Sequence, residues 1–279
     1  MTHPAFNAGR TAVVTGAANG IGLAASKRFA ALGMNVCMAD DSAPDLGLAE
    51  AAVREIAEGS GGVVLAVLSD VGQRDDIVAL KDAVYDAFGE VAVLMNNAAS
   101  RIGNGTFGDA DEWRRVVDVN LWGIVDGSKI FAPAMIEQGT PSVIVNTGSK
   151  QGFTNPPGNF GYNMTKSAVK TFTEGLQHDL RNIEGCQVTA HLLVPGWTTR
   201  GKAEHKPGAW HPEQVVEVLE AALDRGDFYI ICGDDDVTPE MDRTRILWGA
   251  GDVVDNRPPL SRWHGEYDDA FKAFAKTAS

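Results

Sequence analysis

Seven short apolar runs rich in β-branched residues recur along the chain, separated by stretches with the spacing of amphipathic helices. A run that is apolar at every position is typical of a strand buried on both faces, whereas a half-buried strand alternates apolar and polar residues. We therefore predict strands at residues 11–14, 36–39, 63–68, 91–95, 143–146, 188–194 and 228–232.

Strands that alternate with helices indicate an α/β fold. Right-handed crossovers would order them as a doubly wound (Rossmann-like) seven-stranded parallel sheet with helices on both faces, and ligands would bind at the carboxyl ends of the strands. No Pro/Ser-rich linker or internal repeat divides the 279 residues, so we predict a single domain over residues 1–279. The least regular stretches are residues 196–212 and the tail from about residue 233.

The first predicted strand runs into Thr15-Gly16-Ala17-Ala18-Asn19-Gly20-Ile21-Gly22, which opens a helical pattern. Closely spaced glycines let a backbone approach a phosphate, and a helix N-terminus offers N–H groups to it. The spacing is G-x-x-x-G-x-G rather than the commoner G-x-G-x-x-G, so a glycine-rich turn without a ligand is the alternative.

The second predicted strand ends at Asp40, 18 residues after Gly22. An acid at this place suits the ribose hydroxyls of NAD and repels the 2′-phosphate of NADP. A solvated acid at a strand end is the alternative interpretation. No arginine lies in the glycine turn or just after Asp40, which favours NAD.

Short polar residues follow the next two strands. Asp70, with Val71 after it, is expected to contact the adenine edge of a nucleotide or to cap the helix expected to start near Gln73, and the two roles are compatible. In Asn96-Asn97-Ala98-Ala99, small side chains would let a cofactor lie against the backbone while the amides pin the loop.

Two polar residues belong to the following helical stretch. Asp111 is expected to cap it. Asn120 lies inside an otherwise apolar part, where its amide either bridges a buried network or is an ordinary satisfied polar group.

The fifth predicted strand leads to Ser149, and Tyr162 and Lys166 lie on a helix further along. Residues four apart share a helix face, so the phenol and the ammonium can reach one site. A tyrosine in water titrates near pH 10, about 4 kcal/mol away from a useful base at pH 7. An exposed pair supplies only about 0.5 kcal/mol, so acid/base chemistry requires a dry site and a second positive charge, such as oxidised nicotinamide. A surface Tyr–Lys pair is the alternative.

Together these segments resemble the short-chain dehydrogenase/reductase family, in its short single-domain branch. The matched pieces lie in family order, cover roughly residues 8–200, and are Thr15-Gly16-x-x-x-Gly20-x-Gly22, Asp70, Asn96-Asn97-Ala98, Asn120, Ser149, Tyr162-x-x-x-Lys166 and Pro195-Gly196.

The resemblance implies hydride transfer between NAD(H) and a small secondary alcohol or ketone. It implies that Tyr162 is the general acid/base, that Ser149 hydrogen-bonds the substrate oxygen, that Lys166 binds the nicotinamide ribose and makes the phenol more acidic, and that Asn120 holds a water of a proton relay. The implied cofactor-binding residues are Gly16, Asn19, Gly20, Ile21, Gly22, Asp40, Asp70, Val71, Asn97, Ala98, Val119, Tyr162, Lys166, Pro195, Gly196 and Thr198.

Two positions depart from the family pattern. Ala99 stands where glycine is frequent, and Arg200 stands where a threonine often binds the carboxamide, so Thr198 or Thr199 takes that role. Two other functions stay open: an NAD-binding sensor or scaffold without turnover, and an epimerase or dehydratase that holds NAD tightly.

Substrate choice is expected to lie in the irregular stretches. We predict a substrate lid at residues 196–212, where Arg200, Lys202, His205 or Lys206, or else Lys150 outside it, receives an acidic or phosphorylated substrate. An ordinary solvated loop is the alternative. The tail, residues 234–279, contains two tryptophans, which predicts a subunit interface or a pocket cover in a homodimer or homotetramer.

Composition and net charge limit the possible binding partners and the location of the protein. A net charge of −13 argues against nucleic acid, and no apolar run is long enough for a membrane span. The chain starts without signal-peptide features, and Cys37 and Cys232 lie in apolar runs as free thiols, so a cytoplasmic location is expected. The six histidines lack metal-ligand spacing, so we predict no metal site.

Overall fold

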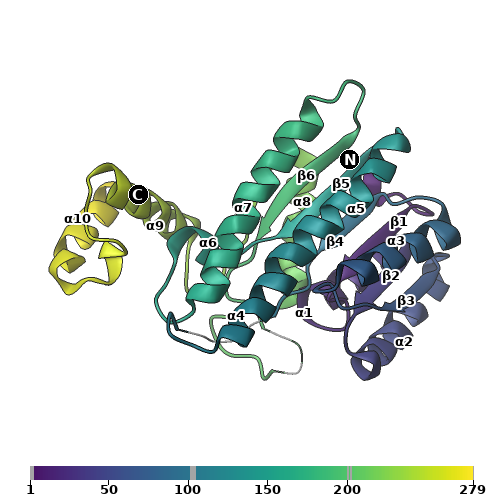
Figure 1. Cartoon of the computed structure of the whole chain (residues 1–279), viewed down its shortest axis with the longest axis horizontal. Coiled ribbons are helices and arrows are strands. Elements are labelled where there is room, and N and C mark those ends of the chain that lie inside the picture. The colour runs from purple at the N-terminus through teal and green to yellow at the C-terminus, as the bar shows by residue number, and fades with distance from the viewer. Residues whose placement is uncertain (1–2, 101–104, 200, 202, 279) are drawn as a thin grey trace.

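All seven predicted strands form and lie side by side in one parallel sheet (Figure 1). A computed structural model describes residues 3–100, 105–199, 201 and 203–278. The sheet order is β3-β2-β1-β4-β5-β6-β7. The strand bounds are β1 (Thr11–Thr15), β2 (Asn35–Asp40), β3 (Val64–Leu68), β4 (Val93–Asn96), β5 (Ser142–Thr147), β6 (Val188–Val194) and β7 (Tyr229–Ile231).

Helices cover both faces of the sheet. One face packs against α1 (Gly20–Ala31), α2 (Ala43–Ser60) and α8 (Pro212–Arg225), and the other against α3 (Arg74–Phe88), α5 (Gly123–Glu137) and α7 (Phe160–Arg181). Neighbouring residues of β1 point to opposite cores, since Ala12 and Val14 belong to the first and Val13 to the second. The predicted doubly wound single domain is confirmed.

The strand order reverses beside β1, which pairs with β2 on one side and with β4 on the other. The connections that follow β1 and β4 therefore leave the sheet in different directions, and a crevice opens between them at the carboxyl ends. The glycine turn after β1 and the loop after β4 form its walls.

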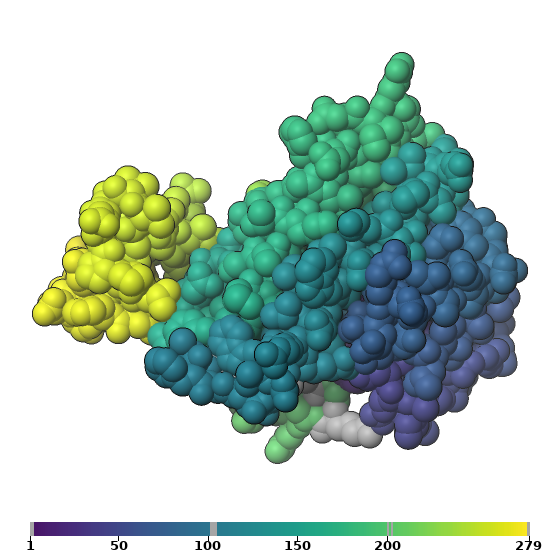
Figure 2. Space-filling model, in the orientation of Figure 1, coloured from purple at the N-terminus to yellow at the C-terminus, as the bar shows by residue number. Residues whose placement is uncertain are grey.

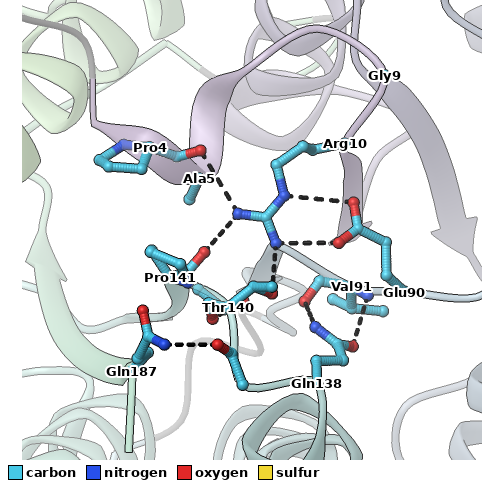
Figure 3. A network of polar contacts seen from close by, with 12 residues as sticks. Pro4, Ala5, Gly9, Arg10, Glu90, Val91, Gln138, Thr140, Pro141 and Gln187 are labelled. Carbon is cyan, nitrogen blue, oxygen red and sulfur yellow. Dashed lines mark hydrogen bonds and ion pairs between the residues drawn. The ribbon is translucent and has the colours of Figure 1, made fainter.

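At the opposite, amino end of the sheet, Arg10 holds three strand starts together (Figure 3). Its guanidinium donates to both carboxylate oxygens of Glu90, at 3.3 and 3.0 Å, and to the Pro141 carbonyl at 2.5 Å. These partners precede β4 and β5, so the network fixes the sheet far from the crevice.

The C-terminal arm, residues 239–278, projects away from the sheet (Figures 1 and 2). It consists of α9 (Pro239–Val254), two short 3₁₀ turns and α10 (Asp268–Ala278). Trp248 is its centre: the ring lies edge-on to Phe271 and Phe274, with centroids 5.4 Å away in each case, and the indole N–H donates to Ser261 at 2.8 Å. Arg257 covers the same ring at 4.0 Å. The arm thus has a small core of its own.

Cys37 and Cys232 are buried free thiols, as predicted, and burial raises the pKa of each to about 12. In the part of the chain with described coordinates, no helix has the length and apolar character that a membrane span needs. The same residues contain no cluster of three or more His, Cys, Asp or Glu side chains that could hold a metal ion.

Candidate active site

A cleft of about 540 Å³ lies at the carboxyl ends of the strands, where the order reverses. Its lining includes the predicted residues Gly16, Asn19, Gly20, Ile21, Asp40, Asp70, Val71, Asn97, Ala98, Val119, Ser149, Tyr162, Lys166, Pro195, Gly196 and Thr198. Two predicted residues, Gly22 and Asn120, lie behind the wall instead of in it.

At the glycine turn after β1, the backbone passes very close to the loop after β4. Gly16 and Gly20 have φ values of +64° and +53°, which glycine adopts without strain. A Cβ on Gly16 would lie 2.8 Å from the Ala98 Cα, and one on Gly22 would lie 2.1 Å from the Gly16 carbonyl oxygen. Gly22 therefore shapes the turn from behind, and the N-terminus of α1 opens directly into the cleft.

The loop after β4 is pinned to this turn by the amide predicted to pin it. The Asn97 side chain donates to the Thr15 carbonyl at 3.0 Å, and the backbone N–H groups of Asn97 and Ala98 donate to the Thr15 hydroxyl at 2.9 and 3.1 Å. One wall of the cleft is thereby rigidly joined to the other.

The Asp40 carboxylate closes the cleft at the end of β2. It accepts hydrogen bonds from the backbone N–H of Ala18 at 3.0 Å and of Ser42 at 3.1 Å. The Asp40 carboxylate therefore holds the glycine turn in place and also lines the cleft. The alternative of a solvated acid at a strand end is wrong.

Arg115 is a cleft residue that the sequence analysis missed. It lies on α4 (Ala110–Val117), one helical turn before Val119, and this i, i+4 spacing was the available signal. Its guanidinium donates to the Asp70 carboxylate at 2.8 and 3.0 Å and reaches Asp41 at 3.4 Å.

The Asp70–Arg115 pair answers the question of what Asp70 does. Partial burial by itself would raise the pKa of Asp70, but hydrogen bonds from Arg115 and the Gly72 N–H outweigh it and hold that pKa below its ordinary value. Asp70 does not cap α3: Gln73 is the N-cap residue, and the Asp70 carboxylate accepts the Gly72 N–H at 2.9 Å, one residue before it.

Asn120 lies in a π-helical turn, Asp118–Trp122, between α4 and α5. The side chain is fully buried; its oxygen accepts the Ser100 N–H at 2.7 Å, and its nitrogen donates to the Ser100 carbonyl at 2.9 Å. The amide thus joins a network, one of the two alternatives raised above, and fixes the loop after β4.

Ser149, Tyr162 and Lys166 meet in the same part of the cleft. They are 8%, 2% and 1% exposed, so their side chains are largely shielded from solvent, as the acid/base interpretation requires. The Lys166 ammonium donates to the Thr147 carbonyl at 2.6 Å and lies 5.6 Å from the centroid of the Tyr162 ring. A surface pair is thereby excluded.

The lining fits a dinucleotide. The turn at Gly16 leaves no room for a Cβ, as a backbone cradle for a pyrophosphate requires. Two buried hydroxyls in the lining, Ser69 Oγ and Thr147 Oγ1, have no hydrogen-bond partner in the described part of the protein. A buried polar atom is normally paired, so these hydroxyls can serve polar groups of a ligand.

The segment predicted as a lid begins and ends on a backbone ladder. Trp210 donates its N–H to the Trp197 carbonyl at 2.8 Å, and Thr199 donates to the Trp210 carbonyl at 2.9 Å. Thr198 and Thr199 both line the cleft. The Thr199 hydroxyl is hydrogen-bonded to His205 at 2.8 Å, whereas that of Thr198 makes a longer 3.3 Å bond to Gly196. Arg200 and Lys202, two of the proposed substrate cations, lie outside the described residues.

Two expectations are wrong. Lys150 does not line the cleft, because its ammonium is turned away into an ion pair with Asp234 and Asp242. Asp111 does not cap α4: Asp109 is the N-cap residue, and its carboxylate accepts the N–H of Asp111 at 2.9 Å.

Comparison with known proteins agrees with this geometry. The family model described as short chain dehydrogenase matches residues 10–207. The chain belongs to the short-chain dehydrogenase/reductase family. It is 35% identical over 267 residues to a 1-deoxy-11-beta-hydroxypentalenate dehydrogenase of Streptomyces exfoliatus, covering 91% of this chain and 94% of the relative. It is 34% identical over 189 residues to 3beta-hydroxysteroid dehydrogenase 1 of Eggerthella lenta, covering 67% and 70%.

Solved structures agree. A short-chain dehydrogenase/reductase from Burkholderia phymatum in complex with NAD superposes with a TM-score of 0.81 at 29% identity, covering 93% of this chain and 98% of the other. A metagenomic short-chain oxidoreductase in complex with NADP gives 0.69 at 27% identity, covering 81% and 98%. The protein is therefore an oxidoreductase of a family that binds NAD or NADP.

Proposed function

We propose that the protein is an NAD-dependent dehydrogenase that interconverts a secondary alcohol and a ketone. The observation that carries the proposal is that Ser149, Tyr162 and Lys166, all nearly buried, line one cleft together with the glycine turn. When bound, NAD accepts a hydride from the carbinol carbon of the substrate.

Three residues act on the substrate and the proton. Ser149 positions the substrate oxygen by a hydrogen bond, and Tyr162 takes the hydroxyl proton as general base or returns it as general acid. Lys166 is held by the Thr147 carbonyl, so its charge stays close to the Tyr162 ring. Asn120 positions the Ser100 loop, and its part in a proton relay follows from the family resemblance.

The test is single-turnover reduction of NAD, followed at 340 nm, across a panel of secondary alcohols. The two relatives above are named for a hydroxylated pentalenate and a hydroxysteroid, so alicyclic alcohols lead the panel. Tyr162→Phe should lower the rate about 10²- to 10⁴-fold with NAD binding retained. An unchanged rate would remove Tyr162 from the mechanism.

NAD is proposed over NADP on the charge of the adenine end. Asp40, Asp41 and Asp70 line this end with a single described cation, Arg115, which is already paired with two of them. A 2′-phosphate would face net negative charge there. Titration of both cofactors tests this proposal, and tighter binding of NADP would contradict it.

The two rival functions make different predictions. A sensor or scaffold would bind NAD without reducing it on any alcohol, and an epimerase or dehydratase would retain NAD through purification without net turnover. A sensor or scaffold does not need the full set of Ser149, Tyr162 and Lys166. An epimerase or dehydratase of this type generally has a larger substrate domain than this chain provides. Neither function is therefore preferred.

We also propose a homodimer or homotetramer in which the C-terminal arm contacts a neighbouring subunit or its pocket. The arm projects from the body (Figure 2). On α9, Leu247, Val253 and Val254 are exposed, the last two by more than 80%. Light scattering and activity of wild type and of Val253→Ser with Val254→Ser, which leaves Asp234 and Asp242 in place, test this proposal. Unchanged size and activity would contradict it.

A further inference from the structure

A buried ion cluster lies directly behind the active site. Lys150 follows Ser149, and its ammonium lies 3.0 Å from Asp234 Oδ2 and 2.7 Å from Asp242 Oδ2. The three side chains are only 14%, 3% and 7% exposed. Asp234 lies in the turn after β7 and Asp242 in the first turn of α9, so the cluster joins three segments that are distant in the chain. The proposed mechanism does not use these residues.

Residues of the cluster are also hydrogen-bonded to the loop after β6. Asp234 Oδ2, which binds the ammonium, accepts the Trp197 N–H at 3.2 Å. The Lys150 N–H reaches the Pro195 carbonyl at 3.4 Å. Between these two bonds, a Cβ on Gly196 would lie 2.4 Å from Asp234 Oδ2 and 3.1 Å from Lys150 Cε. The Asp234 side chain therefore holds Trp197, the Lys150 backbone holds Pro195, and only glycine fits between them.

The charges make the arrangement depend on Lys150. In the described structure both buried carboxylates form an ion pair with Lys150, and Arg245 acts on Asp242 without an ion pair; burial raises the pKa of Asp242 although Lys150 opposes that shift. Without the ammonium, Asp234 would lose the ion pair that the described structure gives it and would face the Asp242 carboxylate in a nearly dry space. The carboxylate of Asp234 would then leave its place, and the Trp197 N–H would lose its acceptor.

We propose that Lys150, Asp234 and Asp242 form a positioning clamp that holds the Gly196-Trp197 backbone against the nicotinamide end of the cofactor and ties this loop to α9. The inference rests on the proposed function and on the family resemblance, which implies that Pro195-Gly196 presents its backbone to the nicotinamide; both residues line the cleft. The clamp touches neither the adenine end nor the glycine turn in the described structure, so its effect is confined to one half of the cofactor.

The test compares NAD with ADP-ribose, which shares the adenine and pyrophosphate but lacks the nicotinamide. Calorimetric titration of full-length Lys150→Met should show NAD binding weakened at least fivefold and ADP-ribose binding within twofold of wild type. Asp242→Asn keeps the bonds of Lys150 and Trp197 to Asp234, so NAD binding should stay within twofold while hydrogen exchange in the first turn of α9 becomes faster. Lys272→Met removes an exposed cation from α10 and should change none of these quantities.

The outcomes separate the clamp from the proposed function. Equal weakening of both ligands by Lys150→Met, or no weakening of either, would overturn the clamp alone. Failure of the wild type to bind NAD would overturn the proposed function and the clamp with it. If Lys150→Met does not fold, Asp234→Ala removes the acceptor of the Trp197 N–H directly and leaves Lys150 paired with Asp242, and the same selective loss of NAD binding is expected.

Discussion

Cofactor preference can be shifted by one charge at the adenine end of the cleft. Asp41 Oδ2 lies 3.4 Å from the Arg115 guanidinium, and the Asp41 side chain is 60% exposed. Asp41→Asn keeps the shape and removes the charge. We expect NADP to bind more tightly and NAD to bind within twofold of wild type, because only NADP has a phosphate at this end.

The magnitude follows from distances. A phosphate oxygen hydrogen-bonded to Arg115 at about 2.9 Å would lie about 6 Å from the Asp41 carboxylate. At the dielectric constant of water, two unit charges at this separation interact by about 0.7 kcal/mol. A phosphate charge of about −1.5 to −2 raises the repulsion to roughly 1.0–1.4 kcal/mol. Removing it should lower the NADP Kd about five- to tenfold.

Fluorescence titration with each cofactor measures this effect, and Asp86→Asn on α3 is the control. That substitution makes the same change in net charge at an exposed site that does not line the cleft. The gain should shrink in 1 M salt, where the screening length falls to about 3 Å. Equal gains for NAD and NADP, or an unchanged NADP Kd, would refute the electrostatic reasoning.

Three further predictions concern the turn, the sheet and the arm. Gly22→Ala should weaken NAD binding about tenfold or more and destabilise the fold by about 1–3 kcal/mol, because its Cβ would lie 2.1 Å from the Gly16 carbonyl oxygen. Titration and urea unfolding measure these effects. Gly47→Ala in α2, where nothing lies within 4 Å of the added Cβ, is the matched control. His191 donates from Nδ1 to the Asp227 carbonyl at 2.8 Å and burial lowers its pKa, so its contribution to stability is present above its unfolded pKa of about 6.5 and is lost as pH falls through the folded pKa. In urea unfolding, the free energy of unfolding should fall less between pH 7.5 and pH 5.5 in His191→Gln than in wild type. Equal decreases would contradict this role of His191. Trp248→Ala removes the centre of the arm and should cost about 3–5 kcal/mol of local stability, so limited proteolysis should cleave residues 239–278 faster, and an unchanged digestion pattern would refute this reading of the arm.

The strands and the cofactor turn could be predicted because their signals are local. An apolar run such as residues 143–146 is buried in any arrangement that covers both faces of a sheet. The glycines at 16 and 20 and the i, i+4 spacing of Tyr162 and Lys166 likewise express backbone geometry between near neighbours. These features determined the fold and brought most of the predicted cofactor residues to one cleft.

Contacts between distant segments were not predictable in the same way. Lys150 is a plausible substrate cation in the sequence, and only the packing of α9 and the turn after β7 brings Asp234 and Asp242 onto it. Arg115 likewise meets Asp70, 45 residues away, through the placement of α4. The partner of a charged side chain depends on which loops converge in space, and a single sequence carries no local signal for that. The sequence by itself thus determined the scaffold and the catalytic residue types, whereas the tertiary structure decided which charges are neutralised and which face the cofactor.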